Sequence, residues 1–179
     1  LDLSADCSSG GVGDLYELLN AGKTIVCIDL KSSDGRACFN EFVRKADVLL
    51  ESYRPGVMER LGLAYNAVKE INPSTVYCSL SGYGQTGPYK HRAGHDINYL
   101  AMTGALSAMG PSSKPSPAFP PMADYGGALQ AASSILGALF YRERTGSGTF
   151  IDIAMADTVL GWQAYGLAKT MSSENKYDE

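Results

Sequence analysis

The sequence predicts an α/β fold, in which a Rossmann-like parallel sheet is flanked by helices. Apolar, β-branched runs of strand length alternate with segments whose apolar residues recur at helical spacing. Successive strand–helix–strand units require crossover connections, and such connections give parallel strand pairing. The length of 179 residues, with 45% hydrophobic and 19% charged residues, fits one globular domain.

The first half of the chain carries this alternation in order. Strands are predicted at 23–30, 47–52 and 74–82, and helices at 34–46, 56–63 and 64–71. Asn72 and Pro73 end the last of these helices, because proline neither donates a backbone hydrogen bond nor fits inside a helix. The three strands and their connections account for the parallel sheet.

The second half begins with a loop over 83–94, "YGQTGPYKHRAG", which is rich in glycine. A helix is predicted over 96–108, an irregular stretch over 110–122, a long helix over 124–146, a strand over 148–155 and a helix over 155–170. The irregular stretch has five prolines in thirteen residues, and Gly146 follows two arginines at the end of the long helix.

Composition restricts the class of function. Fifteen basic and nineteen acidic residues give a net charge of −4, which argues against a nucleic-acid partner. No apolar run reaches the length of a membrane span, and no signal peptide is visible. Cysteines occur at 7, 27, 38 and 78 without CxxC spacing, and two of them, Cys27 and Cys78, stand in apolar runs. We expect these two to be buried, and the thiols to be reduced in an intracellular protein.

The segment "GYGQTG" at 82–87 follows a predicted strand and matches the glycine pattern of dinucleotide-binding turns. In those folds an apolar helix begins at the third glycine, and an acidic residue ends a second strand about twenty residues later. Here "PYKHRAGHD" follows, and no such acidic residue appears. We therefore expect no dinucleotide site, although a glycine loop at the end of a parallel strand can line a ligand crevice.

His95 is one of only two histidines, and it follows Gly94 at a predicted helix start. The positive end of a helix dipole disfavours an imidazolium there, and a neutral imidazole is a competent base. A histidine that only hydrogen-bonds the backbone explains the same pattern. His91 is four residues earlier but lies in the glycine-rich loop, and a metal site needs a third ligand on a shared face. We expect no metal site.

The sequence allows two interpretations of Asp124 and two of Arg54. Asp124 follows the proline-rich stretch and precedes an apolar helix, which is typical of an N-cap. One carboxylate oxygen can cap while the other faces a pocket, and the glycines at 126 and 127 permit close approach. Arg54 directly follows a strand end, where it can hold a phosphate bidentately or simply face solvent. The residues alone leave both choices open.

Six segments, taken in order, resemble CoA-transferase family III, which includes the α-methylacyl-CoA racemases. They are "LNAGKTIVCIDLKSSDG", "ADVLLESYRPGVMERLGL", "INPSTVYCSLSGYGQTGPY", "GHDINYLAMTGAL", "MADYGG" and "RTGSGTFIDIAMAD". The resemblance covers residues 15–170. It implies that residues 1–179 are the CoA-binding large domain, without the family's first strand–helix unit and its small carboxyl-terminal domain. The chain begins without Met, so we expect a piece of a longer protein.

The family's two chemistries are separated at one position. The transferases use the aspartate that matches Asp124 as a nucleophile and tend to have tyrosine where this chain has His95. The racemases have "GHDINY", and their histidine and the same aspartate exchange the α-proton. This chain reads "GHDINYLA", so the resemblance implies racemisation of 2-methylacyl-CoA thioesters by His95 and Asp124. CoA transfer with Asp124 as nucleophile, or a non-catalytic CoA-binding fragment, are the alternatives.

The resemblance also implies a set of binding residues. Ile28, Asp29, Leu30 and Lys31 are expected at the nucleotide part of CoA, Arg54 at its phosphates, and Gly94, Asp96, Ile97, Asn98 and Tyr99 beside the reacting carbon. No cofactor is expected, because CoA is part of the substrate. Family members are interlocked homodimers, so we expect a homodimer when the chain is complete. The expected location is a mitochondrion or peroxisome in a eukaryote and the cytoplasm in a bacterium.

Overall fold

The computed structural model describes residues 2–3, 14–111, 113–117 and 119–174, and it has the expected α/β architecture. Three parallel strands form the main sheet in the order β3-β4-β5, namely β3 (Val48–Glu51), β4 (Val76–Ser81) and β5 (Phe150–Ala154). A separate parallel pair joins β1 (Asp2–Leu3) to β2 (Ile25–Val26). The predicted parallel sheet is therefore confirmed.

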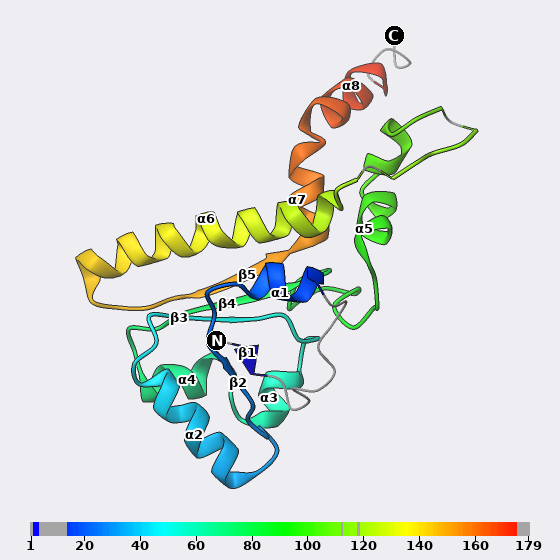
Figure 1. Cartoon of the computed structure of the whole chain (residues 1–179). Coiled ribbons are helices and arrows are strands. Elements are labelled where there is room, and N and C mark those ends of the chain that lie inside the picture. The colour runs from blue at the N-terminus through cyan, green and yellow to red at the C-terminus, as the bar shows by residue number, and fades with distance from the viewer. Residues whose placement is uncertain (1, 4–13, 112, 118, 175–179) are drawn as a thin grey trace.

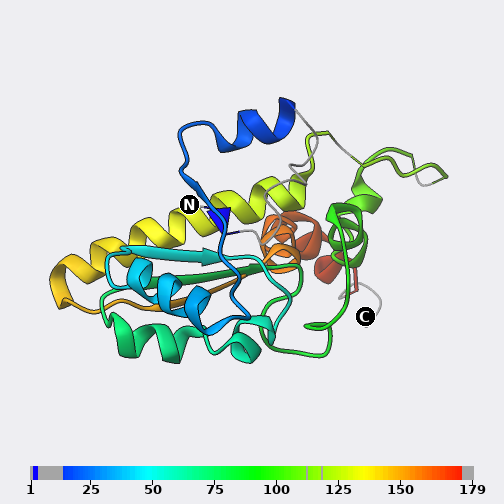
Figure 2. The same ribbon diagram turned by 60° about the horizontal axis from the view of Figure 1, so that its bottom comes forward.

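Helices cover both faces of the main sheet (Figures 1 and 2). On one face lie α2 (Ser33–Val43), α3 (Val57–Leu61) and α4 (Tyr65–Ile71), and on the other lies α6 (Met122–Thr145). At one end of the sheet lie α5 (Asp96–Met102), the 3-10 turn η1 (Ala105–Ala108) and α7 (Met155–Trp162), and α8 (Ala164–Glu174) extends away from the sheet. The short helix α1 (Asp14–Asn20) precedes β2.

The core divides between the two faces of the sheet. Under α2, α3 and α4, the largest cluster includes Phe39, Val43, Met58, Val68 and Tyr77. A second cluster forms where α5, α6 and α7 meet, and a third lies between α6 and the strands. Burial of such side chains supplies about 1.5–3 kcal/mol each relative to exposure. The second cluster matters most for the site, because it fixes the helix starts described below.

Two predicted helices are each broken in the structure, and one predicted strand is reduced to two residues. The helix expected over 96–108 ends at Met102 because Gly104 has a left-handed backbone, with φ of 79°, and the chain continues as η1. The helix expected over 155–170 is interrupted at Gln163. The strand expected over 23–30 retains only Ile25 and Val26, which pair with Asp2 and Leu3 of β1.

The long helix α6 is confirmed, but its buried positions are small residues rather than large ones. Its buried positions are Ala123, Gly126, Gly127, Ala131 and Ala138. A Cβ added at position 127 would lie 2.6 Å from a side-chain atom of Met155, so the helix packs too closely there for a larger residue. Leu129, Leu136 and Phe140 are between 63% and 68% exposed. Helical periodicity alone does not reveal which apolar residues are inside.

The cysteine prediction is correct at one position and wrong at the other. Cys78 is buried and free within β4. Cys27 is exposed and disulfide-bonded, contrary to the expected buried thiol. It is exposed because the chain has already left the two-residue strand β2 at this point.

Among the helices of the described residues, none combines the length and the apolar character that crossing a membrane requires.

Candidate functional site

The three parallel strands end beside one cavity of about 360 Å³. β3, β4 and β5 end at Glu51, Ser81 and Ala154, and the segments that follow these ends line the cavity. The lining residues are 52–55, 80–83, 90, 92–95, 99 and 155. Ligands of open parallel sheets bind outside the carboxyl ends of the strands. This cavity is therefore the candidate site, and the glycine-rich loop helps to line it as expected.

His95 lies at the cavity as the N-cap of α5. Its backbone is extended, and its N–H donates to Oδ1 of Asn98 over 2.9 Å. This is one half of a capping box, in which the third helical residue reaches back to the N-cap. Asn98 thereby fixes the backbone of His95, which is one of the residues that line the cavity. The predicted helix start is confirmed.

The buried side chain of Tyr99 fixes the backbone just before His95. Its side chain is 4% exposed, and its hydroxyl donates to the carbonyl oxygen of Gly94 over 2.7 Å. A Cβ at Gly94 or at Gly82 would collide with the Tyr99 ring, so both positions need glycine. Burial raises the pKa of Tyr99, with smaller contributions from Tyr83 and the two nearby aspartates. The phenol therefore stays protonated and keeps its donor role.

Asp96 caps α6 from the neighbouring helix α5. Its Oδ1 accepts hydrogen bonds from the backbone N–H groups of Ala123, over 2.6 Å, and Asp124, over 3.2 Å. The residue at the N-cap of α6 itself is Pro121, which has no side-chain acceptor. The prediction that Asp124 is the N-cap is therefore wrong. Asp124 lies in the first helical turn, and Asp96 supplies the cap across 28 positions of the sequence.

Asp124 lies close enough to His95 for the two charges to influence each other. Desolvation raises the pKa of Asp124 above its ordinary value, repulsion by Asp96 raises it further, and His95 lowers it. The Asp124 side chain is nevertheless largely exposed and is not among the cavity-lining residues. The structure thus brings the two predicted catalytic residues to adjacent helix starts, and of the two only His95 lines this cavity.

A second cavity of about 380 Å³ collects the residues predicted for the nucleotide. It is lined by Ile28, Asp29, Leu30, Lys31, Tyr53, Val57, Arg60 and Leu61. Tyr53 lines both cavities, so the segment after β3 connects the two. Arg54 lines the His95 cavity together with Lys90 and Arg92. Asp96, Ile97 and Asn98 line neither cavity.

The lining residues that sequence reasoning missed include Tyr53, Arg60, Lys90 and Arg92. Three of them are cations in segments that follow a strand end, and this position is the signal that was available for them. Arg60, in the last turn of α3, lies in the same quoted segment as Arg54. Within the described residues, no group of three or more His, Cys, Asp or Glu side chains is placed to hold a metal ion.

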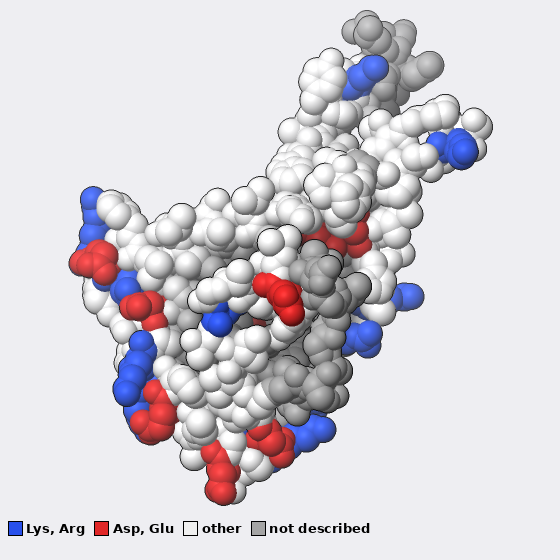
Figure 3. All heavy atoms as spheres, in the orientation of Figure 1, with Lys and Arg blue, Asp and Glu red and all other residues white. Residues whose placement is uncertain are grey.

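The charges near the cavities suit an anionic ligand locally. The cations at 54, 90 and 92 line the first cavity without an acidic side chain, whereas Asp29, Lys31 and Arg60 give the second a mixed character. On the face shown in Figure 3, acidic and basic residues are interspersed over a mainly uncharged surface. A phosphate-bearing small molecule fits these local cations better than a long polyanion does.

Comparison with known proteins gives a consistent family. A family model described as CoA-transferase family III matches residues 5–179. The chain is 42% identical over 166 residues to an acetyl-CoA:oxalate CoA-transferase of Acetobacter aceti, covering 87% of this chain and 41% of the relative. It is 43% identical over 149 residues to the α-methylacyl-CoA racemase of Homo sapiens, covering 81% of this chain and 39% of the relative.

A solved structure supports the fold. The crystal structure of a CAIB/BAIF family protein from Brucella suis matches with a TM-score of 0.80 and 35% identity, covering 86% of this chain and 41% of the other. The chain thus spans about two fifths of the length of the relatives it matches.

Proposed function

The chain belongs to CoA-transferase family III, and within this family we propose that it racemises 2-methylacyl-CoA thioesters. The observation that carries the proposal is His95, an N-cap imidazole at the strand-end cavity whose neighbour across the helix starts is Asp124. Relatives of similar identity include both a transferase and a racemase, so overall similarity does not choose between the two reactions. The residue at position 95 carries the choice.

The proposed reaction is an exchange of the α-proton. One residue removes the proton from the carbon next to the thioester carbonyl and leaves an enolate. The other residue then delivers a proton to the opposite face. The C–H bond broken on one face of the α-carbon is thus replaced by a C–H bond on the other face. Two unlike groups, an imidazole and a carboxylic acid, suit this exchange because one is basic while the other carries a proton.

The enolate oxygen needs hydrogen-bond donors, and α5 is the proposed source. The amides of Ala123 and Asp124 at the start of α6 already donate to Asp96. These two amides are therefore not the proposed donors. The first-turn amides of α5 lie beside His95, where an oxyanion would also meet the positive end of the helix dipole.

CoA is proposed to lie across both cavities. The nucleotide would occupy the cavity at residues 28–31 and Arg60, and the thioester would reach the cavity at His95. Arg54 and the cations at 90 and 92 are available for phosphate oxygens between these ends. CoA is then part of the substrate, and no separate cofactor is required by this mechanism.

The rival reaction in the family makes Asp124 a nucleophile, and trapping separates the two. A nucleophilic carboxylate forms an acyl anhydride that hydroxylamine converts to a hydroxamate, whereas a proton-transfer carboxylate never bonds the acyl group. We predict no hydroxamate when the complete protein is treated with a 2-methylacyl-CoA and hydroxylamine. Mass spectrometry of the peptide from Pro121 to Arg142 reads this out, with Asp124→Asn as the blank. A hydroxamate on Asp124, with CoA passed to a second acid, would overturn the racemase proposal.

A further inference from the structure

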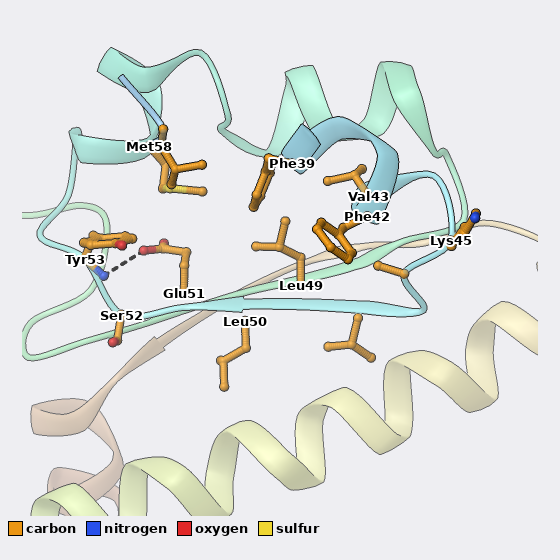
Figure 4. A pocket seen from close by; sticks show the side chains of 13 residues that line it. Phe39, Phe42, Val43, Lys45, Leu49, Leu50, Glu51, Ser52, Tyr53 and Met58 are labelled. Carbon is orange, nitrogen blue, oxygen red and sulfur yellow. Dashed lines mark hydrogen bonds between the residues drawn. The ribbon is translucent and has the colours of Figure 1, made fainter. Parts of the chain in front are cut away.

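A buried carboxyl group, Glu51, lies at the end of β3 and takes no part in the proposed proton exchange. Its side chain is 8% exposed. One oxygen accepts a short hydrogen bond from the Ser79 hydroxyl on β4. The other accepts from the backbone N–H of Tyr53 over 2.8 Å, as the dashed line in Figure 4 shows. Glu51 and Ser79 are register partners in the sheet. The carboxyl group therefore joins two strands to the segment that leaves them.

Keeping an ionisable group in this place is costly. Desolvation raises the pKa of Glu51 above its ordinary value, and the bonds from Ser79 and Tyr53 lower it only in part. A buried polar group is normally retained where its hydrogen bonds are satisfied, and an apolar residue of similar volume would avoid the desolvation. The hydrogen-bonding geometry that Glu51 provides is thus the feature that needs a function.

That geometry acts on the residues that line both cavities. Tyr53, whose amide is held by Glu51, borders the nucleotide cavity and the His95 cavity. Ser52 and Arg54, on either side of Tyr53, line the His95 cavity. All three are exposed, so the neighbouring core does little to fix them. Glu51 fixes their backbone at the point where the strand ends.

We propose that Glu51 is a positioning residue for acyl-CoA, which holds the 52–54 segment between the two cavities in its ligand-binding conformation. The ligand in this inference rests on the proposed function. Two properties of the side chain are separable, its charge and its reach. If reach is what matters, a group that spans the same gap without charge should replace it, and a shorter charged group should not.

Glu51→Gln and Glu51→Asp test these properties in opposite directions. In the Gln variant the amide oxygen accepts from the Tyr53 N–H, and the amide nitrogen donates to the Ser79 hydroxyl, which turns to accept. In the Asp variant the carboxylate is one methylene shorter and cannot span both partners. Glu51→Ala removes both bonds. Glu70→Ala, which removes an exposed glutamate from α4, is the matched control.

The measurements are the Kd for CoA by calorimetry and KM and kcat for α-proton exchange, in the complete protein. We expect Gln and the Glu70 control to stay within about twofold of wild type, and Asp and Ala to raise Kd and KM by about tenfold, the scale of one buried hydrogen bond. We expect kcat to change less than KM throughout. Thermal unfolding establishes that each variant is folded. If the Ala variant does not fold, the comparison of the Gln and Asp variants still tests the proposal.

Two results would overturn the inference. One is a normal Kd in the folded Asp and Ala variants, and the other is Asp rescuing binding where Gln fails. If wild type shows no α-proton exchange while Kd still follows the expected order, the positioning role stands and the racemase proposal fails.

Discussion

Different hydrogen bonds hold the two regions of the candidate site. One region, which we call the His95 corner, is formed by His95, Asp96 and Asp124 at the starts of α5 and α6, and the other is the cavity at residues 28–31. At the start of α6, the backbone N–H of Asp124 donates to Oδ1 of Asp96, which lies 28 positions earlier in the chain. At residues 28–31, the hydrogen bonds are local, since the Lys31 N–H donates to Asp29 Oδ1 over 2.9 Å and Arg36 donates to the Lys31 carbonyl over 2.7 Å. Changes at the corner should therefore alter the chemistry, and changes at the nucleotide cavity should alter only binding.

The largest effect is expected at Asp124. Asp124→Asn keeps the shape of the side chain but removes the group that exchanges protons, so kcat should fall by about 10²–10⁴-fold while CoA still binds. Stopped-time epimerisation assays and calorimetry measure the two quantities. Asp157→Asn is the matched control, because Asp157 is an exposed aspartate in the first turn of α7. Weak CoA binding with a normal kcat would contradict this division of roles.

His95→Ala should cost a similar factor, but on one face of the substrate only. Removing the imidazole stops abstraction from the face it serves and leaves some α-deuterium exchange from the face that Asp124 serves. Exchange rates measured separately for the two epimers test this. His91→Ala, which alters the other histidine, should leave both rates close to wild type. Near wild-type exchange from both epimers of His95→Ala would rule out His95 as a base.

At the nucleotide cavity, Arg60→Ala should act on affinity alone. Loss of a cation beside a phosphate should weaken CoA binding by about tenfold, the scale of one charge-assisted hydrogen bond, with kcat unchanged. Arg144→Ala removes an exposed arginine from the end of α6 and serves as the control. A fall in kcat with a normal KM would show that the two regions are not separable in this way.

The smallest effects should come from Asp96, where two variants separate capping from charge. Asp96→Ala should lower the stability of α6 by about 1 kcal/mol, because its first-turn amides lose their acceptor. Asp96→Asn keeps an acceptor but removes a negative charge, so the pKa of Asp124 should fall. For the epimer whose α-proton Asp124 removes, the acidic limb of kcat/KM should then move to lower pH. An unshifted pH profile in the Asn variant would contradict the influence of Asp96.

The raised pKa of Asp124 should also make the free energy of unfolding depend on pH. The pKa of Asp124 is raised on folding, so its contribution is fully present below the ordinary value of 3.8 and is lost as pH rises through the folded value. Asp124 is largely exposed, so solvent screening keeps this contribution small. Asp96→Asn should reduce that loss, and chemical unfolding at pH 4 and pH 7 measures the difference.

The sequence predicted the elements of this fold better than their contacts. Alternating strands and helices follow from residue pattern, and α6 and the three parallel strands lie where that pattern puts them. The pattern did not reveal that α6 packs through Gly127 and Ala131 while Leu129 and Leu136 face out. That choice depends on how closely the helix approaches the sheet, which is a tertiary property.

The site shows the same limit. The position of His95 before a helix follows from local sequence, because capping depends on adjacent residues. The cap of α6 by Asp96 joins two distant segments, so local rules assigned it to Asp124 instead. The sequence around Glu51 did not indicate its hydrogen bonds, because the pattern is that of an ordinary residue at the end of a buried strand. Long-range hydrogen bonds are the part of the site that only the fold reveals.

The proposed racemisation is tested most directly by α-deuterium exchange. The complete protein is incubated in deuterated water with one pure epimer of a 2-methylacyl-CoA, and the product is analysed for deuterium and for configuration at the α-carbon. We predict one deuterium at that carbon together with progressive loss of configurational purity. Retention of the α-proton and of configuration, with transfer of CoA to an added carboxylic acid, would contradict the proposal and identify a transferase.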